Sequence, residues 1–152
     1  MKIEQANLQQ LKIVKTITHQ TIREIYSHYY ALGAVQFFLN HHSNHHIMKG
    51  IKNGDVYLIY HHDDVVGTVT INENEICRLF VLPKFQGHGF GSKLISFAEN
   101  EIAKNYESIV LDASLPAKSL YLKRGYVIKD THSLLMENGD YLCYDNMQKK
   151  CD

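Results

Sequence analysis

The chain has 152 residues, of which 45% are apolar, and this size and composition suit one globular domain over residues 1–152. Sixteen basic residues balance sixteen acidic ones, which argues against a protein held to nucleic acid or an anionic membrane by net charge. No run of about 18 apolar residues occurs, so we expect no membrane span. Three widely spaced cysteines without a CxxC pair favour reduced thiols in a cytoplasmic protein.

The first third of the chain predicts helices. Apolar residues recur at three- and four-residue steps over 18–30, which is typical of an amphipathic helix. A second helical piece is expected over 34–39. A third is expected to begin after Ser43 as its N-cap and to end at Asn53-Gly54.

The pattern then changes to β-rich runs. DVYLIYHH (55–62) and VVGTVTI (65–71) flank a short polar turn and predict a hairpin. EICRLFVL (75–82) ends before Pro83 and predicts a third consecutive strand, covered on both faces because its apolar residues fall on both parities.

Helices and strands alternate in the remaining part. A helix is predicted from Gly89 to Lys104, a strand over 108–113, and a helix opened by Ser114 and Pro116 and closed by Gly125. Two last strands are expected over 126–130 and 140–147. This order predicts the α/β class, with a mixed sheet in one domain.

The segment QGHGFG (86–91) lies between a predicted strand and a predicted helix. Glycines let the main chain approach a ligand closely, and the free N–H groups of a helix start favour phosphate or pyrophosphate. A Walker loop fails because 91–93 read GSK, and a GxGxxG loop fails because the spacing is GxGxG after an antiparallel meander. A QxxGxG loop and a plain tight turn remain.

The sequence resembles the GCN5-related N-acetyltransferases (the GNAT family) in two motifs. LFVLPKFQGHGFGSKLISFAE (79–99) fits the family's strand, Q/R-x-x-G-x-G/A loop and helix. SLPAKSLYLKRGY (114–126) fits its second motif, except that Ser114 stands where the family usually has asparagine. The resemblance implies a GNAT-like fold with a central, mostly antiparallel sheet flanked by helices.

The resemblance also implies an activity, the transfer of an acetyl group from acetyl-CoA to a primary amine of a small molecule or peptide. The amine would attack directly in a ternary complex. Two alternatives stay open: a non-catalytic acyl-CoA-binding module, and an interaction protein whose glycines only turn the chain. Small members of the family also imply a homodimer, formed through edge strands.

Binding of acetyl-CoA is expected to use main-chain groups. N–H groups of the loop and the first helical turn would hold the pyrophosphate, and the main chain of Phe80 and Val81 would pair with the pantetheine arm along a splayed strand. An N–H near Val81 would bind the acetyl oxygen. Lys118, Lys123 and Arg124 fit either a 3′-phosphate contact or a solvated face. The predicted cofactor-binding residues are Phe80, Val81, Gln86, Gly87, His88, Gly89, Phe90, Gly91, Ser92, Ser114, Lys118, Tyr121 and Lys123.

Two residues are predicted to be catalytic. Tyr121 matches the family's tyrosine beside the thioester sulfur, and its phenol would protonate the leaving thiolate. Glu75 lies eleven residues before Gln86, where histone-acetylating relatives place a catalytic glutamate, and would act as the base if burial raises its pKa. The alternatives are a core aromatic for Tyr121, and a solvated turn residue for Glu75 with ordered water as base. Cys77 is expected to be a buried small hydrophobe and not a nucleophile.

The acceptor is not identified by the sequence. Aromatic residues predict a pocket for a small amine or an N-terminal residue, and acidic candidates accompany them. The histidines over 41–46 are expected to be an incidental surface tract, and no metal is predicted. The candidates are Tyr26, Tyr29, Tyr30, Phe37, Phe38, Tyr141 and Tyr144, with Asp112, Glu137, Asp140 and Asp145.

Overall fold

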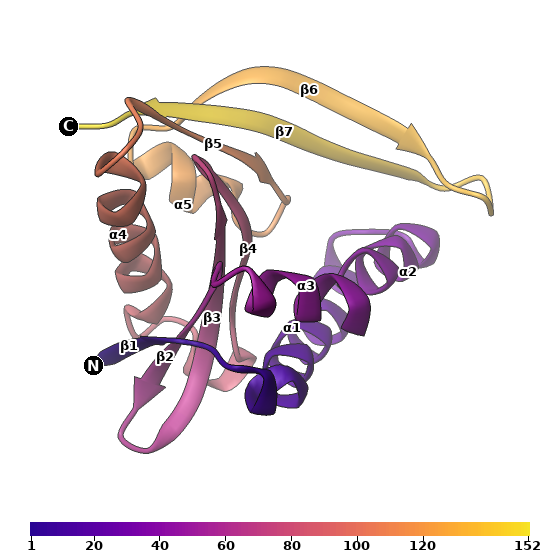
Figure 1. Cartoon of the computed structure of the whole chain (residues 1–152). Coiled ribbons are helices and arrows are strands. Elements are labelled where there is room, and N and C mark those ends of the chain that lie inside the picture. Colours follow the sequence, from indigo (N-terminus) through magenta and orange to yellow (C-terminus); the bar gives the residue numbers. More distant parts are fainter.

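The computed structural model describes residues 1–152, which form a seven-stranded sheet with helices on both faces (Figure 1). The strands are β1 (Lys2–Gln5), β2 (Val56–His61), β3 (Asp64–Asn72), β4 (Glu75–Val81), β5 (Ser108–Ala113), β6 (Val127–Leu135) and β7 (Tyr141–Lys150). The helices are α1 (Leu11–Ile25), α2 (Leu32–His41), α3 (Asn44–Lys52), α4 (Phe90–Ala103) and α5 (Lys118–Lys123), with short 3₁₀ helices η1 (Leu8–Gln10), η2 (Tyr26–His28) and η3 (Pro83–Phe85).

The strands follow the order β1-β2-β3-β4-β5-β7-β6 across the sheet. All neighbours are antiparallel except β4 and β5, which pair in parallel. The predicted α/β class with a mixed, mostly antiparallel sheet is therefore confirmed. None of the helices combines the length and the apolar character that a membrane crossing requires.

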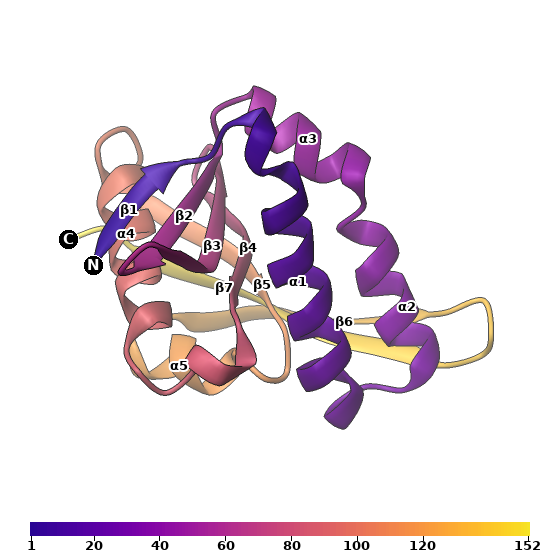
Figure 2. The same cartoon turned by 90° about the horizontal axis from the view of Figure 1, so that it is seen from below.

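Helices on the two faces of the sheet bury separate cores, because the central strands carry apolar side chains on both sides. α4 covers one face with Leu94, Ile95 and Ala98, which are fully buried. α1 and α2 cover the other face, where Ile22 and Tyr26 pack in a second cluster. Figure 2 shows α1, α2 and α3 together on one side of β2–β4 and α4 on the other.

Several predicted boundaries are confirmed. β2 and β3 form the expected hairpin, which turns at His62 in the left-handed region with φ of 55°. Ser43 caps α3, because its Oγ accepts the N–H of His46. Gly125 follows α5 with φ of 94°, a conformation that glycine adopts without strain.

The structure corrects the N-terminal predictions in three places. β1 was not predicted, because it is a mostly exposed, polar edge strand without apolar alternation. α1 begins at Leu11 and not at Thr18, since Val14 and Ile17 extend its buried stripe. α2 begins at Leu32 and not at Ala34, where the helical piece over 34–39 was expected to begin.

The predicted start of α5 is also wrong. The helix begins at Lys118, and Ser114 does not cap it. The Ser114 carbonyl accepts the N–H groups of Ala117 and Lys118, so residues 114–117 form a turn ahead of the helix. Pro116 lies inside this turn.

β4 is irregular on one side and loses its neighbour on the other. Ile71 faces Ile76 but Thr70 faces Arg78, so Cys77 is the extra residue of a bulge. β5 pairs with β4 only at the beginning of β4, where Glu75 faces Val110 and Ile76 faces Leu111. Beyond Ile76 the two strands diverge and leave one edge of β4 without a partner.

The β6–β7 hairpin extends past the sheet and over α2 (Figure 1). Its tip is attached there, since the N–H of Gly33 donates to Asp140 Oδ2 at 2.9 Å. β6 forms the outer edge of the sheet, and every residue in it is exposed.

Candidate active site

The glycine loop presents a row of unpaired main-chain N–H groups. Gly87 and Gly89 have φ of 78° and 89°, and a Cβ at either would meet no atom within 4 Å. The first hydrogen bond of α4 runs from the Lys93 N–H to the Gly89 carbonyl, and no protein acceptor takes the N–H groups from Gly87 through Ser92. These groups face open space at the positive end of the helix dipole, which is the arrangement that binds phosphates.

Side chains of the loop hold its shape. Gln86 Nε2 donates to the Val81 carbonyl at 2.9 Å, which ties the loop to the end of β4. His88 Nδ1 lies 2.9 Å from the Gln86 carbonyl. Phe90 is buried in the core, so its side chain does not face a ligand at the loop. Ser92 lies in the first turn of α4 and is partly exposed. Gln86 and His88 therefore shape the loop with their side chains.

The free edge of β4 begins close to the loop. The Leu82 N–H donates to the Val66 carbonyl, and Phe80 faces Thr68 in the same register, so these residues direct their main-chain groups at β3. Because the groups alternate along a strand, the N–H of Val81 points to the side from which β5 has diverged. Val81 thus has an open main-chain donor, whereas the main chain of Phe80 is already directed at β3.

A cavity of about 450 Å³ lies where β4 and β5 separate. Its walls come from α2, β4, β5, α5 and the β6–β7 hairpin, segments far apart in the sequence. Four of the aromatic residues expected at the acceptor site line it, namely Tyr26, Phe37, Phe38 and Tyr144. Tyr29 and Tyr141 are mostly exposed and Tyr30 accepts the Leu115 N–H, so these three lie outside it.

Glu75 and Tyr121, the predicted base and acid, both line this cavity. Burial raises the pKa of the Glu75 carboxyl, and the Asp112 carboxylate raises it further. A carboxyl with a raised pKa is a better proton acceptor near neutral pH.

Tyr121 is almost fully buried on α5 and stacks edge-on against Tyr126, with ring centroids 5.4 Å apart. It is therefore part of the core as well as of the cavity wall. Burial raises the pKa of its phenol above the ordinary value, so the hydroxyl stays protonated at neutral pH. A protonated phenol at the cavity wall is able to donate a proton.

Cys77 differs from the prediction because it is exposed on the bulge and not buried. Its Sγ lies 3.8 Å from the main-chain oxygen of Glu75, and no histidine bonds to it. Although the residue is exposed, surrounding protein atoms keep water from part of the thiol, and this desolvation together with the neighbouring Glu75 raises its pKa to about 12. A thiol in this state is a poor nucleophile at neutral pH, as expected from the sequence.

The histidine tract is not an incidental surface feature throughout. α2 ends at His41 and α3 begins at Asn44, so the histidines do not share one helix. His42 is buried and accepts a hydrogen bond at Nδ1 from Arg78 Nε, 3.0 Å away. No three His, Cys, Asp or Glu residues of the protein lie together as a metal site would require.

Arg78 was missed by sequence reasoning, although it lines the cavity. Its signal was a basic residue within an otherwise apolar strand, EICRLFVL. An arginine is rarely buried in a strand without a partner, so its position alone could have indicated a buried polar contact or a ligand site.

The predicted basic residues have different surroundings. Lys118 forms a salt bridge of 2.7 Å with Asp145, and Arg124 pairs with Glu99. Lys123 is exposed and forms no salt bridge. Ser114 lines the cavity between β5 and α5.

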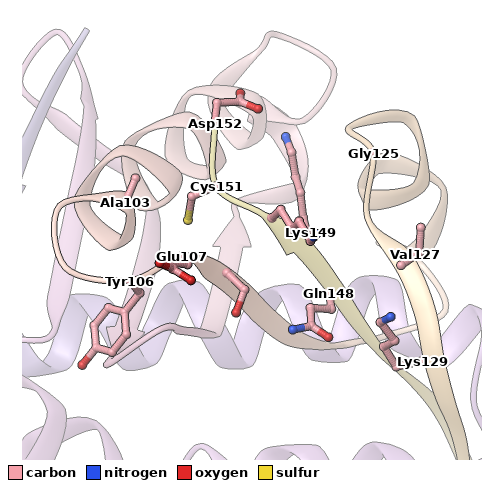
Figure 3. A pocket seen from close by; sticks show the side chains of 12 residues that line it. Ala103, Tyr106, Glu107, Gly125, Val127, Lys129, Gln148, Lys149, Cys151 and Asp152 are labelled. Atoms are coloured by element: carbon pink, nitrogen blue, oxygen red, sulfur yellow. The ribbon is translucent and has the colours of Figure 1, made fainter.

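A larger cavity of about 820 Å³ lies elsewhere, near the C-terminal end (Figure 3). It is lined by the end of α4 and by β6 and β7, with Tyr106, Lys129 and Lys149 among its residues. None of the predicted site residues lines it, so size alone does not indicate the active site.

The acetyltransferase (GNAT) domain family matches residues 13–150. The chain belongs to the GNAT acetyltransferase family. The matched range includes both sequence motifs, the glycine loop and the turn that leads into α5. No curated protein sequence matches the chain.

Solved structures of GNAT proteins share this fold at low sequence identity. A GCN5-related N-acetyltransferase from Rhodopseudomonas palustris has a TM-score of 0.87 at 20% identity, with 98% of this chain and 94% of that one covered. The PaiA N-acetyltransferase from Thermoplasma acidophilum, solved with coenzyme A, has a TM-score of 0.77 at 19% identity, with 98% of each chain covered. YncA from Salmonella typhimurium, a putative acetyltransferase solved with acetyl-CoA, has a TM-score of 0.74 at 16% identity, with 100% and 94% covered.

Proposed function

We propose that this GNAT protein transfers an acetyl group from acetyl-CoA to a primary amine of a small molecule or peptide. The observation that carries the proposal is a series of main-chain N–H groups that have no acceptor within the protein. Unpaired N–H groups run from Gly87 to Ser92, and the N–H of Val81 opens beside them onto the free edge of β4. A pyrophosphate followed by an amide-bearing pantetheine arm matches this series of anion-binding and strand-pairing groups.

The side chains around the cavity supply the proton movements of the transfer. Glu75 accepts a proton from the acceptor ammonium, directly or through a water molecule, so that the amine nitrogen can attack the acetyl carbon. The N–H of Val81 donates to the acetyl oxygen as negative charge develops there. Tyr121 gives its phenolic proton to the sulfur as the carbon–sulfur bond breaks, and the attacking nitrogen then passes its surplus proton to the resulting phenolate as the amide forms.

Calorimetric titration with acetyl-CoA tests the donor site. Wild-type protein should bind with a Kd of about 1 µM to 1 mM, the range typical of Michaelis constants. Gly89→Glu should abolish binding for two reasons. The new carboxylate would lie in front of the row of N–H groups and repel a phosphate, and a residue other than glycine is strained at the positive φ of position 89.

Gly139→Glu is the matched control. Gly139 has φ of 90° and open space around it, so it carries the same strain at the distant hairpin tip. Equal loss of binding in both variants, or no binding by folded wild type, contradicts the proposal.

A non-catalytic acyl-CoA-binding module is the alternative function. It predicts the same titration result without consumption of the thioester. Release of free coenzyme A thiol in the presence of an amine library separates the two, and Glu75 and Tyr121 on one cavity favour turnover.

The homodimer expected of a small GNAT protein remains a proposal, and β6 is the strand that would form it. β6 is an exposed edge that carries the apolar residues Val127, Ile128, Leu134 and Leu135. Sedimentation of the wild type and of Leu135→Lys measures it: a dimer that dissociates in the variant supports pairing through this edge, and a wild-type monomer rejects it.

A further inference from the structure

The acceptor cavity contains a buried positive charge that the protein does not neutralise. Arg78 is only 8% exposed. Its Nε donates to His42 Nδ1 at 3.0 Å, and its Nη1 donates to Thr70 Oγ1 at 2.9 Å. Both partners are uncharged acceptors. They fix the guanidinium in place but leave its charge uncompensated.

No carboxylate of the protein forms a salt bridge with this guanidinium. Its Nη2 has no hydrogen-bond partner, yet it is not among the enclosed orphan atoms, so it remains accessible. Arg78 lines the 450 Å³ cavity, and we take this cavity as the route by which a ligand reaches Nη2. A buried charge without a counter-ion is costly, and such a group is retained where a ligand supplies the missing charge.

The other ionisable groups of the cavity lie on different walls. His41 lies on the α2 side and shares the cavity with Arg78. Glu75 and Asp112 stand at the start of β4 and in β5, and neither forms a salt bridge with Arg78. The cavity is thus cationic at Arg78 and anionic at Glu75 and Asp112, with aromatic side chains as further walls.

We propose that the acceptor is an amine that also carries a carboxylate, that Arg78 binds this carboxylate through Nη2, and that Glu75 and Asp112 face the amine. The proposal rests on the proposed transfer to an amine and narrows its substrate class. A zwitterionic amino compound with an apolar body matches the positions of both charges and of the aromatic walls.

A carboxylate fits the cavity better than a phosphate does. Arg78 offers one cation, while Glu75 and Asp112 already place two anionic groups in the same cavity. A doubly charged phosphate would gain one favourable contact and face repulsion from both carboxylates. A carboxylate carries one negative charge, which neutralises the single positive charge of Arg78 and leaves no further negative charge to be repelled by Glu75 and Asp112.

Matched acceptors test the proposal through release of coenzyme A thiol. Each set contains an aromatic L-amino acid, its primary amide and its aminophosphonate analogue. In wild type we expect kcat/KM for the acid to exceed that for the amide by about 30-fold or more, and to exceed that for the phosphonate. In Arg78→Gln the acid and the amide should become equal within about threefold, and Arg78→Lys should restore part of the preference.

A turnover-independent arm separates failure of this inference from failure of the proposed function. Binding of N-acetyl-L-phenylalanine and of its amide is measured by calorimetry on wild type and Arg78→Gln, each checked for folding by circular dichroism. Tighter binding of the acid by wild type, lost in the variant, supports the carboxylate site even if no amine is acetylated. Equal binding of acid and amide by wild type, or a preference that survives in Arg78→Gln, overturns it. A preference for the phosphonate overturns it as well, in favour of a phosphate-bearing acceptor.

Discussion

Arg78 Nε donates a hydrogen bond to Nδ1 of His42, and this contact joins the bulged strand β4 to the end of α2. The imidazole accepts at Nδ1, so it is neutral. Burial, with the positive charge of Arg78 as a second cause, lowers the pKa of His42 to about 2. The contact therefore orients Arg78 and also makes the protein sensitive to acid.

His42→Leu should destabilise the protein by about 1–3 kcal/mol at pH 8, since it removes an acceptor from a buried charged donor. In the unfolded chain His42 binds a proton below about pH 6.5, whereas in the folded chain it does not. The free energy of unfolding of the wild type therefore falls as the pH drops below that value, by about 1.4 kcal/mol per pH unit for this group. The variant lacks this group, so the difference in free energy of unfolding between wild type and His42→Leu becomes smaller at low pH. Urea unfolding at pH 8 and pH 5 measures both effects. His45→Leu, at an exposed position, is the control; a pH-independent difference for His42→Leu would reject this account.

Tyr121→Phe should lower kcat by about tenfold or more while the Kd for acetyl-CoA changes little, because only the proton donor is removed. Tyr126→Phe is the matched control. It removes a hydroxyl from the ring stacked on Tyr121, but Tyr126 bonds to Glu99 and does not line the cavity. Single-turnover rates with saturating amine measure the effect, and an unchanged kcat in Tyr121→Phe would assign Tyr121 to the core alone.

Glu75→Gln should remove the acidic limb of the pH–kcat/KM profile. In wild type the rate rises as the pH passes through the raised pKa of Glu75, since only the ionised carboxylate accepts a proton.

The raised pKa of Glu75 also means that ionisation disfavours the folded state, so the free energy of unfolding falls as the pH rises from the unfolded to the folded pKa. Glu75→Gln should therefore have a lower kcat/KM than wild type at pH 7 and a slightly higher melting temperature. At pH 4 the melting temperatures of variant and wild type should be equal. Glu73→Gln, in the exposed turn, serves as control; an unaltered limb would favour water as the base.

Glu99→Gln should destabilise the protein by about 1–3 kcal/mol, between the values typical of exposed and buried ion pairs. Glu99 pairs with Arg124 and, at 3.0 Å, with Lys149, which links α4 to β7 and to the end of α5. Burial alone would raise the pKa of Glu99, but hydrogen bonds from Arg124 and Lys149 outweigh it and lower the pKa. The contribution is thus complete above the unfolded pKa of about 4.5 and is lost as the pH falls through the folded value.

Thermal melts at pH 7 and pH 3 test this sign. Glu101→Gln is the control, since its pair with Lys104 is largely exposed and should contribute less than about 0.5 kcal/mol. A Glu99→Gln penalty that is as large at pH 3 as at pH 7 would show that packing, and not charge, is responsible.

Local signals in the sequence were sufficient for most of the fold. The β2–β3 hairpin, the Ser43 cap and the glycine loop each depend on residues close together in the chain, and each was predicted. The segment 114–117 was read as a helix start, because Ser and Pro favour a first turn just as they favour the tighter turn found there. β1 carries too few apolar residues to be told from a loop without its partner β2.

The contacts around the cavity between β4 and β5 were predicted less well, because they join residues that are distant in sequence. Arg78 and His42 are 36 positions apart, and neither shows in isolation that it will be buried against the other. Asp112 was one of four acidic candidates, and only the divergence of β5 from β4 selects it. The bulge at Cys77 also reverses the alternation on which strand reading depends.

The proposed donor site and the proposed acceptor site use different parts of the residues that form them. The proposed donor site uses main-chain N–H groups, from Gly87 to Ser92 and at Val81, which almost any sequence supplies if the backbone path is kept. The proposed acceptor site uses side chains such as Arg78, and a single substitution removes any one of them. Descendants of such a protein can keep the same donor through long divergence while they exchange acceptors. Relatives that share this fold at 16–20% identity therefore have no need to share a substrate.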